Sequence, residues 1–284
     1  MPHKYKEGHS FQRRLRSQGL RARKGLGQNF LVVESVADAI IGAAGLTRDD
    51  TVLEVGPGLG ALTDKLASAA GRVIAVELDE TLASRLGKKL GACRNLSIVH
   101  ADILRQDLKG LVGDHPYKVV ANIPYYITSP ILRYFMRAGR RPELMVIMMQ
   151  EEVARDVTAP AGKMGFLAVS MRLFSNPEII LRVPAASFYP APKVDSAVVK
   201  FNMLPAPALQ VGDIDGFLEL VHCGFSAPRK QLRNSLAIGL KVSAADAESI
   251  LRRSGIDAER RPGSLTLEEW SALYRAAGDV RCPG

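Results

Sequence analysis

Short apolar runs alternate, over the first half of the chain, with stretches whose apolar residues recur at helical spacing. Within residues 32–45, for example, Val36, Ile40 and Ile41 share one face of a helix, and Gly45 can end it. We predict strands at residues 51–55, 72–76, 96–99, 118–121 and 144–149, and helices at 32–45, 59–69, 80–90, 129–138 and 151–157. Strands that alternate with helices in this way indicate an α/β fold with a parallel sheet covered on both faces.

The later part of the chain has a different pattern. Two runs, residues 179–183 and 196–201, are separated only by a Pro-rich loop, which predicts an antiparallel hairpin at one edge of the sheet. Residues 203–212 have the proline content of a linker, and only helical patterns follow. These helices are expected at 214–223, 228–240, 244–253 and 267–277. We therefore predict a basic arm over 1–24, an α/β domain over 25–205 and a small all-α domain over 206–284.

The positive charge of the chain is concentrated near its N-terminus. The chain carries 38 basic and 29 acidic residues, a net charge of +9, and residues 1–24 hold eight basic residues against one acid, Glu7. A basic arm favours a polyanion such as nucleic acid as partner, although a solvated tail has the same composition. No apolar run approaches the roughly 18 to 20 residues of a membrane span, and no cysteine or histidine pair has zinc-ligand spacing. We expect a cytoplasmic protein without a metal site.

A glycine-rich turn leaves the first strand of the α/β pattern and enters a helix. Gly56 and Gly58 let the backbone turn sharply and approach a ligand, and Glu77 ends the next strand about 20 residues later, where an acid can accept hydrogen bonds from ribose hydroxyls. With Ala61, this spacing also fits the dinucleotide fingerprint, so a nicotinamide enzyme stays open at this point. Asp102 ends the third strand and suits an adenine amino group, although an Asp before a helix is often only a cap.

The fourth strand ends in Asn122-Ile123-Pro124-Tyr125, which resembles the motif of methyltransferases that act on amino groups. The amino nitrogen of adenine is a poor nucleophile because its lone pair is delocalised into the ring. The Asn122 oxygen and a backbone carbonyl near Ile123 or Pro124 can accept its two N–H groups, and Tyr125 can stack on the base. Positioning alone can then supply most of the acceleration, with no strong general base.

Four further stretches make the resemblance specific, and with them the chain is similar to the ribosomal RNA small-subunit adenine N6,N6-dimethyltransferase family between about Arg23 and Leu236. They are residues 24–31 (KGLGQNFL), 150–154 (QEEVA), 188–198 (FYPAPKVDSAV) and 229–236 (RKQLRNSL). One departure is Ile123, where the wider amino-methyltransferase motif has proline. The family itself commonly has an aliphatic residue there.

The resemblance implies a Rossmann-like methyltransferase fold, with a mostly parallel seven-stranded sheet, and S-adenosyl-L-methionine as cofactor. Carried over by position, the cofactor contacts are Asn29, Leu31, Gly56, Glu77, Asp102 and Asn122, to which we add Gly58 from the glycine turn. The implied substrate is a pair of adjacent adenosines in a hairpin loop near the 3′ end of small-subunit rRNA. Each adenosine would receive two methyl groups at N6 during maturation of the small ribosomal subunit.

Two further sets of residues follow from the motifs. Phe188 lies between the two late strands and, with Tyr125, could sandwich a flipped adenine next to Asn122 and Pro124; alternatively, Phe188 packs the hairpin onto the core. The basic residues expected to contact RNA are Arg21, Arg23, Lys24, Lys193, Arg229, Lys230 and Arg233. The last three are expected on one face of the helix at 228–240, where a merely solvated face is the alternative.

Three other functions compete with this interpretation. A large-subunit rRNA methyltransferase that confers antibiotic resistance would use the same chemistry, but the Lys193 to Ser196 motif and the helix over 229–236 argue against it. A non-catalytic nucleic-acid-binding factor on the same scaffold is disfavoured by the intact set of Gly56, Glu77, Asp102 and Asn122. A nicotinamide oxidoreductase lacks a residue set for hydride transfer. We expect the protein to act as a monomer, because its partner is a large RNA particle.

Overall fold

A computed structural model describes residues 21–278, apart from the side chain of Lys24. Most of the predicted basic arm therefore lies outside the described residues. Contacts divide the chain into two compact units, one formed by Met1–Ala154 with Glu178–Met203 and the other by Arg155–Pro177 with Leu204–Gly284. The second unit thus includes a segment from the middle of the chain, and the boundaries 1–24, 25–205 and 206–284 remain a prediction.

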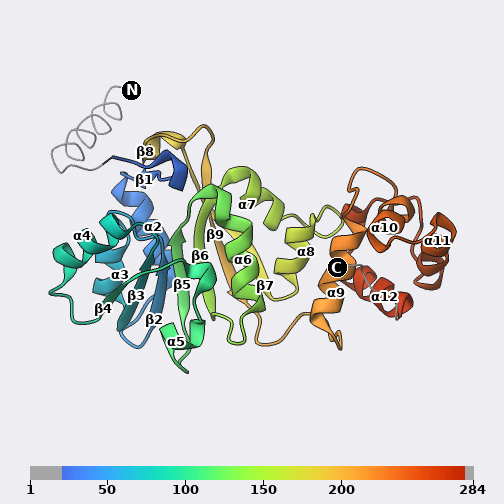
Figure 1. The fold of residues 1–284 in the computed structure, drawn as a ribbon, viewed down its shortest axis with the longest axis horizontal. Helices are drawn as coiled ribbons and strands as arrows, with labels where there is room; N and C mark the ends of the chain where they lie inside the picture. The colour runs from blue at the N-terminus through green and yellow to red at the C-terminus, as the bar shows by residue number, and fades with distance from the viewer. Residues whose placement is uncertain (1–20, 279–284) are drawn as a thin grey trace. The chain divides into compact units, whose positions relative to one another are not determined.

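A seven-stranded sheet forms the centre of the first unit (Figure 1). Its order is β4 (Leu96–His100), β3 (Arg72–Glu77), β2 (Thr51–Val55), β5 (Lys118–Asn122), β6 (Leu144–Gln150), β9 (Ser196–Met203) and β7 (Ser175–Val183). The strands from β4 to β6 are parallel, and β9 runs antiparallel to β6. The predicted fold class, with a parallel sheet that ends in an antiparallel edge hairpin, is confirmed.

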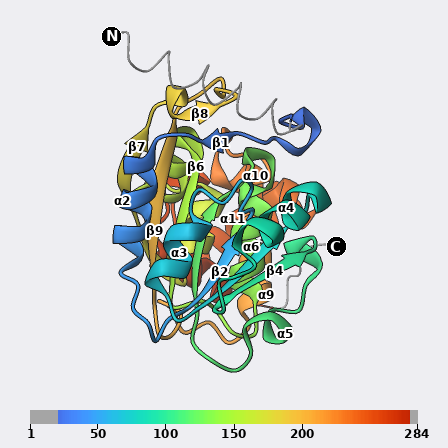
Figure 2. The same ribbon diagram turned by 90° about the vertical axis from the view of Figure 1, so that its left-hand side faces the viewer.

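Helices pack on both faces of this sheet. The helices of residues 34–157 are, in chain order, α2 (Glu34–Ala44), α3 (Thr63–Ala69), α4 (Glu80–Leu90), α5 (Leu108–Val112), α6 (Thr128–Arg137) and α7 (Glu151–Val157). On one face, Ile40 of α2 and Leu66 of α3 bury their side chains in a core cluster with Val52 and Val120 of the strands; Figure 2 views the sheet nearly edge-on, with α2 to the left of the strands and α6 to the right. Figure 1 shows α6 on the opposite face. The strand order reverses between β2 and β5, and ligands of open α/β sheets bind outside the carboxyl ends of the strands at such a point.

Two features of the first unit differ from the pattern predictions. The helix expected at 59–69 begins only at Thr63, because the glycine turn continues through residue 62 and leaves just seven residues for α3. A small antiparallel sheet was not predicted: β1 (Phe30–Leu31) pairs with β8 (Phe188–Tyr189), and Figure 2 shows the two strands near each other at one end of the unit. Strands of two residues are too short to carry a periodic pattern.

Helices alone form the folded part of the second unit beyond residue 204. They are α9 (Ile214–Gly224), α10 (Leu232–Leu240), α11 (Ala244–Arg253) and α12 (Leu267–Ala277), and the unit also contains α8 (Phe166–Arg172). Trp270 is fully buried and stacks on Phe225 with ring centroids 5.5 Å apart. None of the helices described in residues 21–278 is long and apolar enough to span a membrane.

The helix predicted at 228–240 was placed too early. Arg229 and Lys230 lie in a turn, and α10 begins at Leu232. The N–H groups of Leu232 and Arg233 donate to the carbonyls of Arg260 and Ala258, so tertiary contacts rather than a further helical turn satisfy this helix end. Only Arg233 of the three basic residues is on the helix.

Candidate active site

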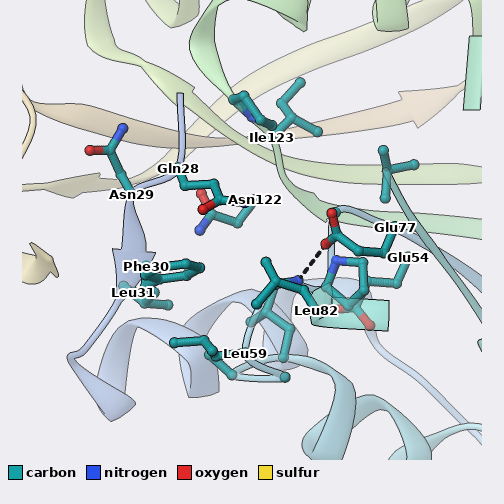
Figure 3. A pocket seen from close by; sticks show the side chains of 18 of the residues that line it. Gln28, Asn29, Phe30, Leu31, Glu54, Leu59, Glu77, Leu82, Asn122 and Ile123 are labelled. Atoms are coloured by element: carbon teal, nitrogen blue, oxygen red, sulfur yellow. Dashed lines mark hydrogen bonds between the residues drawn. The ribbon is translucent and has the colours of Figure 1, made fainter. Parts of the chain in front are cut away.

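One cavity of about 450 Å³ lies at the carboxyl ends of β2, β3, β4 and β5. This volume is in the range of about 300 to 1,000 Å³ that is typical of small-molecule sites. Its walls come from the N-terminal segment around residues 26–34, the glycine turn, the tips of β3 and β4, and residues 122–127 after β5. Figure 3 shows Gln28, Glu77 and Asn122 around this cavity.

The glycine turn after β2 has a backbone that only glycine adopts without strain. Gly56, Gly58 and Gly60 all have positive φ angles, of 69°, 57° and 85°. A side chain at Gly60 would also collide with Leu86, because its Cβ would lie 2.6 Å from the Leu86 Cδ1 atom. The turn therefore presents bare backbone to the cavity, as the sequence predicted for Gly56 and Gly58.

Glu77 lies at the tip of β3 and is buried against this turn. Its Oε2 atom accepts a hydrogen bond from the Gly58 N–H at 2.9 Å (Figure 3), and its Oε1 atom accepts one from the Asp79 N–H at 2.9 Å. Burial raises the pKa of the Glu77 carboxyl, while these two backbone hydrogen bonds oppose the rise. Each oxygen keeps a lone pair that can accept from a ligand hydroxyl, as the sequence predicted for a ribose.

The N-terminal segment is fastened to the rim of the cavity through Asp79, which sequence reasoning missed. Asp79 is only 3% exposed; its Oδ1 atom caps α4 by accepting from the Thr81 and Leu82 N–H groups. Its Oδ2 atom accepts from Gln28 Nε2 at 3.0 Å and lies 3.3 Å from Arg23 Nη1. Gln28 Oε1 in turn accepts from the Arg23 N–H at 2.8 Å. The position of Asp79 just before a predicted helix could have indicated the cap. Its contacts with Gln28 and Arg23 depend on the fold and leave no signal in the sequence.

Asn122 lies at the tip of β5 with its side chain half-buried at the cavity. Among the described residues, nothing hydrogen-bonds to its side-chain amide. The Pro124 carbonyl already accepts from the Ile127 N–H at 3.2 Å, whereas the Ile123 carbonyl takes part in no turn or loop hydrogen bond of the described backbone. Asn122 and Ile123 therefore offer the pair of acceptors that an adenine amino group needs.

The two predicted aromatic residues are placed differently. Tyr125 lines the cavity, and its hydroxyl makes a 2.7 Å hydrogen bond with Ser196 Oγ. Phe188 is 4% exposed, does not line the cavity and packs in the core cluster with α2 residues such as Val36 and Ile40. This placement matches the packing alternative for Phe188, so a sandwich with Tyr125 would need Phe188 to leave the core and stays a prediction.

The remaining predicted cofactor contacts, Asn29, Leu31 and Asp102, come from the N-terminal segment and the tip of β4 and all line the cavity. The Asn29 amide donates to the Gly27 carbonyl at 3.1 Å, and Leu31 is buried in β1. Asp102 accepts from the Leu104 N–H at 3.0 Å and so caps η2 (Ile103–Arg105). The cap that the sequence allowed as an alternative is therefore present, and a contact of Asp102 with adenine remains a prediction.

Glu54 is a second buried acid at the cavity that sequence reasoning missed. Its side chain is 1% exposed, and within the described chain its Oε2 atom has no hydrogen-bond partner. Burial raises the pKa of the carboxyl to about 8, with a smaller contribution from the negative charge of Glu77. An acid inside the apolar run of β2 was the signal in the sequence.

The predicted RNA contacts lie on both units. Arg21, Arg23, Lys193, Arg229 and Lys230 are exposed, Arg233 is half-buried, and the side chain of Lys24 lies outside the description. Two of the exposed or partly exposed cations already have partners: Arg23 pairs with Asp79, and Arg233 lies 3.5 Å from Glu248. RNA contact by these residues is untested and stays a prediction.

This sheet topology, with the Asn122 amide at the cavity beyond the carboxyl ends of the strands, is that of S-adenosylmethionine-dependent methyltransferases that act on amino groups. The residues present fit that cofactor. The glycine turn is open to close approach, Glu77 can accept from a ribose, and the unpartnered Asn122 amide lines the same cavity.

Comparison with known proteins identifies the family. The sequence profile of the ribosomal RNA adenine dimethylase family matches residues 19–276. A ribosomal RNA small subunit methyltransferase A from Dehalococcoides mccartyi is 48% identical over 255 residues, which cover 89% of this chain and 88% of that protein. The protein of the same name from Pelotomaculum thermopropionicum is 42% identical, with 91% and 92% covered. The chain therefore belongs to the ribosomal RNA adenine dimethylase family and is an S-adenosylmethionine-dependent methyltransferase.

Solved structures agree with this assignment. A dimethyladenosine transferase from Plasmodium falciparum superposes with a TM-score of 0.72 at 25% identity, covering 88% of this chain and 98% of that one. The 23S rRNA methyltransferase ErmE superposes with a TM-score of 0.68 at 30% identity, covering 87% and 99%. Membership of this family excludes the nicotinamide alternative.

Proposed function

We propose that the protein transfers methyl groups to N6 of two adjacent adenosines in a hairpin loop near the 3′ end of small-subunit rRNA. The observation that carries this proposal is the Asn122 amide: half-buried at the cavity and without a partner in the described chain, it lies three residues before Tyr125, whose hydroxyl is held by Ser196. That arrangement suits a flat base with an exocyclic amino group. Dimethylation of each adenosine would assist maturation of the small ribosomal subunit.

The residues of the chain would act mainly by positioning. The Asn122 side-chain oxygen and the Ile123 carbonyl accept the two N–H groups of adenine N6, which favours a pyramidal nitrogen with its lone pair directed away from both acceptors. Tyr125 stacks on the base, and Pro124 fixes the backbone between the two. Bound S-adenosylmethionine supplies an electrophilic methyl group. Orientation of this kind can account for about 7 to 11 kcal/mol of a barrier, so no strong base is required.

Relatives favour the small subunit over the large one as substrate. The two proteins with 42% and 48% identity are named as small-subunit enzymes, whereas the large-subunit enzyme ErmE is 30% identical. The exposed cations Lys193, Arg229 and Lys230 are available to contact RNA phosphates. We further propose that the protein acts as a monomer in the cytoplasm, since the expected partner is itself a large particle; size-exclusion chromatography with light scattering tests the monomer.

Transfer of labelled methyl groups to purified ribosomal subunits tests the proposal. We expect the protein to label small subunits that lack dimethyladenosine and to leave large subunits unlabelled. Asn122→Ala serves as the matched inactive control, and calorimetry confirms that it still binds cofactor. Labelling of large subunits alone would replace the proposal with the large-subunit alternative, and absence of cofactor binding by the wild-type protein would revive the non-catalytic alternative.

A further inference from the structure

We propose that Ser196 is a positioning residue for methyl transfer, because it fixes the ring of Tyr125 against which the target base stacks. This inference rests on the proposed function for the identity of the base, but the contact itself lies within the protein. The Tyr125 hydroxyl and Ser196 Oγ are 2.7 Å apart. Ser196 lies 71 residues after Tyr125 in the chain and is the first residue of β9.

Ser196 is held rigidly enough to serve as an anchor. It is 0% exposed and pairs with Gln150 of β6 in the antiparallel register. The preceding residue is fixed twice: the Asp195 carbonyl accepts from the Glu151 N–H at 3.0 Å, and its Oδ1 atom accepts from the Ala185 N–H at 2.8 Å. These contacts fix the backbone position from which the buried Ser196 hydroxyl reaches Tyr125.

Tyr125 needs such an anchor because its own backbone does not determine the direction of its ring. The residue begins the short η3 turn (Tyr125–Ile127) and is only half-buried, and its neighbour Tyr126 is 56% exposed. A tyrosine ring turns about two bonds, and a hydrogen bond to its hydroxyl oxygen restricts rotation about the first, which sets where the ring points. The plane of the ring is set by the groups that pack on its faces. Asn122 must hold the amino group of the base while the Tyr125 ring contacts its face. A ring in a fixed position lets the base make both contacts at the same time.

The protonation of the pair is compatible with this role. Burial raises the pKa of the Tyr125 hydroxyl, so it stays protonated over the physiological range and keeps the hydrogen bond. The ring is not required to react, and either oxygen can donate the proton of the pair. These contacts explain why Asp195 and Ser196 occur in the motif at 188–198: Asp195 fixes the hairpin loop, and Ser196 holds the Tyr125 ring on which the base stacks.

A double-mutant cycle tests this inference. Tyr125→Phe removes the hydroxyl but keeps the ring, and Ser196→Ala removes the partner. If each acts through the other, both single variants should lower the rate of methyl transfer to small subunits by about two- to tenfold, the effect of one net hydrogen bond, and the double variant should be no slower than either. The loss should fall on kcat, with the KM for S-adenosylmethionine unchanged.

Tyr117→Phe is the matched control, because Tyr117 is also buried and donates from its hydroxyl to a backbone carbonyl, that of Arg140, at 3.0 Å. It precedes β5, whereas Tyr125 follows it, so its loss should lower thermal stability and leave methyl transfer unchanged. Wild-type rates for Ser196→Ala, or additive losses in the double variant, would overturn the inference. Failure of the wild-type protein to methylate small subunits would instead overturn the proposed substrate, and the cycle would then be measured on the RNA that the protein does methylate.

Discussion

Two buried carboxyl groups at the cavity have different surroundings. Glu77 accepts two backbone N–H groups and can remain charged when a ligand arrives, whereas Glu54 has one oxygen without any partner in the described chain. A buried carboxyl without enough donors retains its proton instead of its charge. At the residue scale, Glu77 is therefore the acid suited to accept hydrogen bonds from a ligand, and Glu54 is the acid that stays neutral and responds to pH.

The neutral state of Glu54 predicts a specific pH dependence of stability. Its pKa is about 8 in the folded protein against 4.5 in the unfolded chain, so unfolding releases a proton between these values. The free energy of unfolding of the wild-type protein should therefore fall as the pH rises from about 5 to about 8. Glu54→Gln cannot ionise and should lose this contribution, so its stability relative to wild type should improve over the same range. Urea unfolding at pH 5, 6.5 and 8 measures this, and parallel curves for the two proteins would count against it.

Asn122 should be needed for transfer rather than for folding. Asn122→Ala removes one of the two acceptors for the amino group, and we expect methyl transfer to fall by about 100-fold or more, the scale seen when one preorganised polar group is lost. Cofactor affinity should weaken only modestly, because Glu77 and the glycine turn remain. Single-turnover transfer and cofactor calorimetry separate the two effects. A variant that transfers methyl groups at more than a tenth of the wild-type rate would show that Asn122 does not orient the substrate.

At the scale of elements, the N-terminal segment is as much a part of the cavity wall as the tips of the strands are. Its strand β1 pairs with β8 in a separate two-stranded sheet, and Gln28 and Arg23 hold it to Asp79 at the start of α4. A side chain at Gly27 would lie 3.2 Å from the Tyr126 ring, so this segment also approaches the residues after β5 closely. Ordering of residues 23–31 and formation of the cavity are therefore coupled.

Gln28→Ala should weaken cofactor binding. The variant loses the hydrogen bonds to Asp79 and to the Arg23 N–H, so part of the cavity wall is released, and we expect the Kd to rise about three- to tenfold. Asn95→Ala is the control, since the Asn95 amide also bridges two groups, the Ala67 and Ala70 carbonyls, at the other end of the sheet. Calorimetry should show a change in Kd for Gln28→Ala alone. An equal change in both variants would indicate general destabilisation.

Periodicity predicts the long elements and the tips of the strands, because burial on one or both faces imposes a pattern on the sequence. The placement of Gly56, Glu77 and Asn122 at one end of the sheet follows from that pattern. Contacts between distant segments leave no such trace. The Tyr125–Ser196 hydrogen bond, the β1–β8 pair and the start of α10 at Leu232 all depend on partners more than 20 residues away.

At the scale of the whole molecule, the excess of basic residues near the N-terminus and the acidic residues at the cavity lie in different parts of the sequence. The chain has a net charge of +9, and residues 1–24 hold eight of its 38 basic residues. The acids Glu77, Asp79 and Asp102 lie at or beside the cavity, at the tips of β3 and β4 or just after them. We expect the basic residues to contribute RNA affinity and the α/β unit to contribute cofactor binding and catalysis.

Deletion of residues 1–20 should therefore affect RNA more than cofactor. The deletion removes five basic residues, and each lost phosphate contact should reduce the slope of log affinity against log salt by roughly 0.7 to 0.9. Measuring RNA affinity at several salt concentrations between about 50 and 200 mM gives this slope. Cofactor affinity should stay at the wild-type value. Equal losses of RNA and cofactor affinity would contradict the separation.

The most direct test of the central claim is mass spectrometry of small-subunit rRNA from cells that lack this protein. We predict that the two adjacent N6,N6-dimethyladenosines near the 3′ end disappear, that a copy of the wild-type gene restores them, and that a copy carrying Asn122→Ala does not. Dimethyladenosines that persist at wild-type level in the absence of the protein would contradict the account.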